Sequence, residues 1–238
     1  MKKVLVMPVL AAVLFAAACS GEDGGTGPEV PTGGVRFFNA MRAMAVAGGF
    51  TMNGQFVSGS AVGSGQSTAT CAKVDGGSTS FGFGAANPGG TALSGNTLAT
   101  LNNQSIAATG SYTVAAVGSG GHALLFLLDN NFSGSLGSNQ AAVRFVNLAP
   151  SMNPFSVLSG TTGSGTTTPV ASNLALGSAT TFATVTSGSN AYTVLNGQNT
   201  AISGSAGTLN LKAGSVNTIA IAPGTTPGSF QLIDIPRC

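Results

Sequence analysis

The chain has 238 residues, of which 43% are hydrophobic and only 6% are charged. Its formal charge of +2 disappears without Lys2 and Lys3, because the rest of the chain holds six basic and six acidic residues. A nucleic-acid-binding surface needs clustered basic side chains, so this composition argues against a nucleic-acid partner.

The start of the chain is typical of a secretory signal peptide. Residues 1–18 combine two lysines with an apolar run that ends in three alanines directly before Cys19, in the order that export requires. The run has about fifteen residues, whereas spanning a bilayer takes about 20. Residues 16–19 resemble a bacterial lipobox, although Ala16 stands where leucine is usual. We therefore expect a lipoprotein whose mature chain begins at lipidated Cys19. Plain secretion is the alternative.

The next segment predicts a flexible linker. Residues 19–34 begin with the lipidated cysteine and continue with glycine, proline and acidic residues that have little to bury. Ser20 resembles the sorting pattern for the outer membrane. Glu22 and Asp23 resemble acidic signals for surface display, or form a solvated charge pair. The expected location is the outer membrane, held by the lipid and facing the periplasm or the cell surface.

Beyond the linker the sequence predicts strands. The chain's 36 glycines and ten prolines separate short runs rich in Val, Ile, Phe, Thr and Tyr. No stretch sustains helical periodicity over four turns, and short β-branched and aromatic runs between turn residues are strand signals. The predicted class is all-β.

The chain also repeats itself. Five segments return in the same order, displaced by 105 to 111 residues, while a biased Gly/Ser/Thr/Ala composition is the alternative explanation. The first copies are residues 35–40, 69–74, 80–83, 113–117 and 127–129, and the second copies are residues 143–148, 180–185, 191–194, 218–222 and 232–234.

The repeat predicts two tandem domains, residues 35–138 and 139–238, each with about seven short strands. This is the pattern of an immunoglobulin-like β-sandwich. The chain contains no tryptophan, so the Cys-Trp-Cys core of antibody domains is absent and the resemblance is one of architecture.

A family resemblance lies in the second repeat. Residues 143–150 (VRFVNLAP), 173–177 (NLALG) and 211–214 (LKAG) before the strand 218–221 resemble the bacterial family called domain of unknown function 4397. The first repeat departs from the pattern, with Met41-Arg42 in place of Ala149-Pro150 and extra residues around 102–108. The resemblance implies a secreted or lipid-anchored sandwich domain, often in tandem, with no established activity.

Four charged residues occupy equivalent places in both repeats. Arg36 and Arg144 begin equivalent strands, and Asp129 and Asp234 end equivalent strands. We expect a structural ion pair within each domain, Arg36 with Asp129 and Arg144 with Asp234, because a bidentate pair fixes strand register. The alternative is four separately solvated charges.

Two cysteines remain besides Cys19. In an oxidising compartment Cys71 and Cys238 favour a disulfide, which would place the two domains side by side. The alternative is that Cys71 is a small buried hydrophobic residue at the position of Phe182 in the second repeat.

The sequence favours a non-enzymatic envelope lipoprotein, a structural or binding module with no metal and no cofactor. An enzyme, such as a hydrolase with its site at the domain interface, is the alternative, and it would need His122 to meet Asp75, Asp129 or Asp234. The uncharged polar loops 58–67 and 159–168 suit an envelope protein or a glycan as partner, or simple solvation. An exposed aromatic platform would favour a glycan.

Overall fold

The structure is a computed structural model of the chain. It describes residues 33–42, 44, 46–57, 59–119, 121–150, 154–160, 168–202, 206–224, 226 and 228–238. The predicted signal peptide 1–18, Cys19 and nearly all of the linker 19–34 lie outside the described residues. Within the described residues every helix or strand element is a β-strand, which confirms the all-β prediction.

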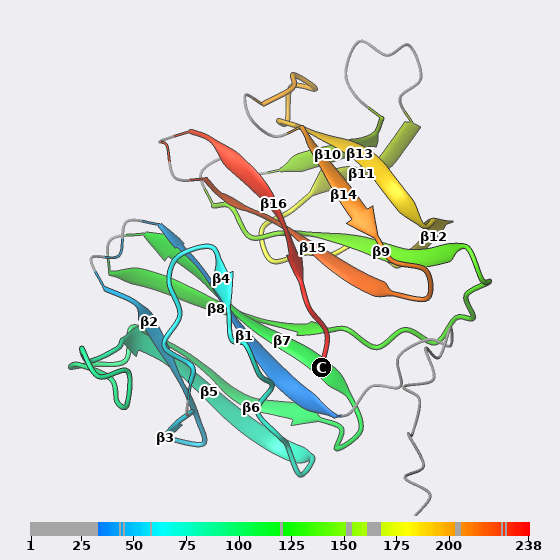
Figure 1. Ribbon diagram of the computed structural model, residues 1–238. Helices are drawn as coiled ribbons and strands as arrows, with labels where there is room; N and C mark the ends of the chain where they lie inside the picture. Colours follow the sequence, from blue (N-terminus) through cyan, green and yellow to red (C-terminus); the bar gives the residue numbers. More distant parts are fainter. Residues whose placement is uncertain are drawn as a thin grey trace, which may run out of the picture.

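The strands form two similar halves (Figure 1). In the first half, β1 to β8, the sheets have the orders β4-β1-β7-β8 and β3-β2-β5-β6. Its strands are β1 (Gly34–Arg42), β2 (Gly48–Met52), β3 (Gln55–Phe56), β4 (Gln66–Ser67), β5 (Gly77–Ala85), β6 (Ala99–Ile106), β7 (Ser111–Ser119) and β8 (His122–Asp129).

The second half, β9 to β16, has the sheet orders β12-β9-β15-β16 and β11-β10-β13-β14, so each strand has a counterpart eight places earlier. The repetition predicted from the sequence is therefore present in the topology. The strands are β9 (Gln140–Asn147), β10 (Phe155–Ser159), β11 (Thr168–Leu174), β12 (Ala183–Thr186), β13 (Gly188–Leu195), β14 (Gly207–Leu211), β15 (Val216–Pro223) and β16 (Phe230–Ile235).

Four central strands are buried along almost their whole length: β1, β7, β9 and β15. In each half two of them pair in parallel, β1 with β7 and β9 with β15. Parallel strands need both faces covered and therefore read as nearly continuous apolar runs, which explains sequences such as Ile219-Ala220-Ile221-Ala222. Parallel pairing at the centre is also a departure from the antiparallel sheets of an immunoglobulin-like sandwich.

Three hydrophobic cores lie between the four sheets. One core fills the first half and contains Phe37, and another fills the second half and contains Phe145. The third core combines residues of both halves, including Phe38 from β1 and Val146 from β9. Because side chains alternate across a strand, Phe37 faces its own half and Phe38 faces the other one. The halves are thus stacked sheet against sheet (Figure 1).

The asparagine repeated in the two copies has the same role in each. Asn39 donates from Nδ2 to the carbonyl oxygen of Val62 and accepts at Oδ1 from the Met41 N–H. Asn147 makes the equivalent bonds to Leu174 and from Ala149. Both asparagines are fully buried, so their side-chain amides provide hydrogen-bond partners for backbone groups that water cannot reach.

Candidate functional site

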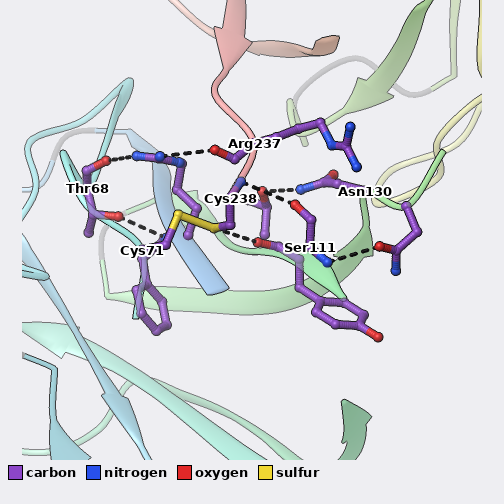
Figure 2. Close-up of a disulfide and its surroundings, with 11 residues drawn as sticks. Thr68, Cys71, Ser111, Asn130, Arg237 and Cys238 are labelled. Carbon is purple, nitrogen blue, oxygen red and sulfur yellow. Dashed lines mark hydrogen bonds between the residues drawn. A yellow bond between two sulfur atoms is a disulfide. The ribbon is translucent and has the colours of Figure 1, made fainter. Parts of the chain in front are cut away.

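The end of the chain crosses from the second half to the first. After β16, residues 236–238 reach the first half, where Cys238 forms a disulfide with Cys71 (Figure 2). The two Cα atoms are 5.8 Å apart although 167 positions separate them in sequence. Cys71 precedes Ala72, which bridges to Val35 of β1. The predicted disulfide is therefore present and joins the two halves.

Hydrogen bonds hold the same tail. The Cys238 N–H donates to Oγ of Ser111 over 3.2 Å, and Nη2 of Arg36 donates to the carbonyl oxygen of Arg237 over 3.2 Å. Nη1 of Arg36 donates to the carbonyl oxygen of Thr68 (Figure 2). Gly34 lies against the disulfide, where an added Cβ would be 3.2 Å from Cβ of Cys71. The start of β1 and the end of the chain are thus neighbours.

A reciprocal contact occurs where the chain leaves the first half. Phe132, shortly after β8, packs edge-on against Phe182 of the second half, with ring centroids 5.6 Å apart. The guanidinium of Arg144 lies over the Phe182 ring, 4.7 Å from its centroid. In the repeat, Arg144 and Phe182 are the counterparts of Arg36 and Cys71. Each half therefore holds the segment that follows the last strand of the other, as in an isologous dimer interface.

Asn130 connects the halves inside this interface. Its Nδ2 donates to Oγ1 of Thr113 over 2.8 Å, and its Oδ1 accepts from Nη2 of Arg144 and from Oγ1 of Thr218. Nε of Arg144 donates to the same Thr218 oxygen over 3.0 Å. Asn130 and both threonines are fully buried. A buried polar network of this kind rigidifies an interface when its members have partners.

The arginines have other partners than the sequence predicted. In the described chain no ion pair joins Arg36 to Asp129 or Arg144 to Asp234; the hydrogen bonds of Arg36 go to backbone carbonyls and those of Arg144 go to Thr218 and Asn130. The reason is geometric, because both arginines face the interface between the halves, where the crossing segments reach them.

The charges around Arg144 nevertheless act on it. Burial lowers the pKa of Arg144 to about 10, the carboxylate of Asp129 opposes this shift, and the charge of Arg237 adds to it. Asp129 itself accepts hydrogen bonds at Oδ1 from the N–H and the Nδ2 of Asn131. Asp129 therefore acts electrostatically on the arginine of the second half and not on Arg36 of its own repeat, the partner that the sequence predicted.

The four candidate catalytic residues line four different cavities. His122 lines a cavity of about 470 Å³, and Asp75 lines one of about 610 Å³ beside the disulfide. Asp234 lines one of about 360 Å³, where desolvation raises its pKa to about 6. Asp129 lines one of about 520 Å³. Each of these groups thus has its own surroundings, and no described group of three or more His, Cys, Asp and Glu residues could hold a metal ion.

The sequence left open whether any aromatic residues form an exposed platform for a glycan. Five of the six ring contacts found in the described chain lie within the two cores of the halves, whereas Phe132 and Phe182 meet outside them. Tyr112 and Tyr192 are buried. The signal that could have revealed the pair is Phe132 itself, an isolated aromatic residue in a Gly/Ser/Asn-rich connection.

No known protein family matches the chain, and no curated protein does. Among the residues described, no helix has the length and apolar character needed to cross a membrane.

Proposed function

We propose that this protein is a non-enzymatic lipoprotein of the bacterial cell envelope, anchored in the outer membrane through Cys19, which presents its two halves as one rigid structural or binding module. The observation that carries the proposal is the joining of the halves by a shared hydrophobic core and a disulfide. Disulfides persist in oxidising compartments, so the bond supports the export that residues 1–19 predict.

Each half, in this proposal, is a sandwich domain of immunoglobulin-like architecture that differs in the parallel pairing of its central strands, residues 35–138 and 139–238, resembling the domain of unknown function 4397 family. The identical strand order of the halves and the equivalent bonds of Asn39 and Asn147 support a tandem duplication.

The distribution of ionisable groups favours a module over an enzyme. General acid–base chemistry needs titratable groups within hydrogen-bond reach of one substrate. His122, Asp75, Asp129 and Asp234 line separate cavities, so a hydrolase with its site at the domain interface is the less favoured alternative.

The test is metabolic labelling of the full chain with a radioactive fatty acid in a Gram-negative host, followed by separation of the membranes. We expect label in the wild type and an outer-membrane location. Cys19→Ala should lose the label and appear in the soluble fraction with its disulfide intact, because the folded halves do not depend on the anchor. An unlabelled wild-type chain, or a Cys19→Ala variant that stays in the membrane, would contradict the proposal.

A further inference from the structure

We infer that the cavity beside Phe132 and Phe182 is a binding site for an uncharged saccharide. This inference rests on the proposed binding role and names its ligand class. The cavity has about 520 Å³ and lies where the connection after β8 meets the second half. Its lining includes Asp129, Phe132, Ser133, Arg144, Thr181 and Phe182.

The aromatic rings provide the apolar part of the site. Phe132 and Phe182 are each half-buried and both line the cavity, so part of each ring is accessible from it. Their mutual contact and the Arg144 guanidinium fix the Phe182 ring. Sugars present C–H groups on their ring faces, and an immobile aromatic surface gains contact area with little loss of conformational entropy.

A buried donor supplies the polar part. Arg144 is only 8% exposed, yet it lines the cavity. Hydrogen bonds occupy its Nε and Nη2, and none of the side-chain hydrogen bonds of the described residues uses its Nη1. A guanidinium nitrogen that is held in place and open to a cavity can donate to a ligand oxygen without being reordered.

A carboxylate and two hydroxyl groups supply hydrogen-bond acceptors in the same cavity. The Asp129 carboxylate receives both Asn131 hydrogen bonds at Oδ1, which leaves Oδ2 for a ligand hydroxyl. The hydroxyl groups of Ser133 and Thr181 line the same cavity on exposed residues. Saccharide hydroxyls both donate and accept hydrogen bonds, so they match a site that offers a cation, a carboxylate and hydroxyls together.

The charge balance selects an uncharged ligand. The positive charge of Arg144 and the negative charge of Asp129 oppose each other at this cavity, so an anionic ligand would meet the carboxylate and a cationic ligand would meet the guanidinium. The cavity at the disulfide differs, because Arg36, Lys73 and Arg237 face a single carboxylate and no aromatic residue lines it.

The experiment is saturation-transfer NMR on the full-length mature chain in detergent, with maltohexaose, cellohexaose, mannohexaose and the N-acetylglucosamine hexamer as probes. We expect at least one of the four to bind with a Kd below about 1 mM. Phe182→Ala should weaken that binding at least about tenfold. Phe56→Ala is the matched control, because Phe56 is a half-buried aromatic residue on β3 outside the cavity.

A second variant keeps the test valid if Phe182→Ala fails to fold. Thr181→Val changes an exposed side chain and should weaken binding severalfold while the thermal unfolding curve stays that of the wild type. A galacturonate hexamer serves as the anionic probe in the same experiment. The inference fails if none of the four uncharged saccharides binds, if only the galacturonate hexamer binds, or if Phe56→Ala weakens binding as much as Phe182→Ala. Fatty-acid labelling of Cys19 tests the anchor independently, so its success beside absent saccharide binding would refute this inference alone.

Discussion

Removal of the Cys71–Cys238 disulfide tests how the two halves are joined. The change is the double substitution Cys71→Ser and Cys238→Ser, which leaves no unpaired thiol between the halves. Both cysteines are half-buried, so the added hydroxyl groups meet water and introduce little cost of their own. The tail keeps its hydrogen bonds from Arg36 and to Ser111, and the core between the halves is unchanged.

The expected loss follows from chain entropy. A crosslink between residues 167 positions apart restricts the unfolded chain, and a loop of that length is worth about 5 kcal/mol of stability in the chain-entropy description. That loss is comparable to the net stability of many domains, about 5 to 15 kcal/mol. The double variant should therefore remain folded only if the shared core between the halves contributes substantially.

The assay is urea unfolding followed by circular dichroism, with wild type and variant compared at equal protein concentration. We expect one transition in both proteins, a lower midpoint in the variant, and a larger slope m in the variant, because the unfolded chain without the crosslink is more expanded and exposes more surface. Reduced wild-type protein is the control and should match the variant. A loss below about 1 kcal/mol would refute the loop argument, and two separate transitions in the variant would show that the core shared by the halves does not unite them.

Three further outcomes follow from single contacts. Gly177 has a φ of 75° and an added Cβ would lie 2.1 Å from the Phe126 ring of the other half, so Gly177→Ala should lose about 2–4 kcal/mol in urea unfolding. Gly54→Ala, at φ 78° with open space around it, should lose less, and equal losses would contradict the contact. Phe38→Ala should lose about 3–5 kcal/mol because it empties the core between the halves, and a loss below about 1 kcal/mol would argue that this core is not packed. Desolvation by the surrounding protein raises the pKa of Asp234 from 3.8 to about 6, so the folded state holds this proton more tightly and stability falls as pH rises through that window. Because the Asp234 side chain also keeps contact with solvent, which screens its charge, the fall should be below about 1 kcal/mol. Asp234→Asn should remove the fall in unfolding curves measured on both sides of the window.

Prediction from sequence succeeded where the signal is local or periodic. Short apolar runs between glycines predicted the strands, because the preferences of residues for strands and for turns act over only a few positions. The matching of residues 35–40 with 143–148 gave the repeat, because equivalent strands need equivalent side chains. A count of cysteines made Cys71 and Cys238 a candidate pair, once Cys19 was assigned to the lipid, and the structure decided between this bond and a buried, unpaired Cys71.

The partners of the charged residues were not predictable in this way. The rule that equivalent arginines and aspartates pair within one repeat assumes that each domain is complete by itself. Arg144 instead meets Asn130 and Phe182, because the segments that follow β8 and β16 exchange between the halves. No local pattern records such an exchange, since it depends on how two folded surfaces meet.

The sequence by itself determined the strand-rich class and its duplication, since these depend on side-chain type and spacing along the chain, and it offered Cys71 and Cys238 as a possible pair. The tertiary structure decided that two sheet faces are buried against each other, which explains why β1, β7, β9 and β15 are apolar on both sides. It also decided that Phe132, Phe182 and Arg144 share one cavity. Residues that are distant in sequence become neighbours only when the cores have formed, because contact follows from packing and not from sequence order.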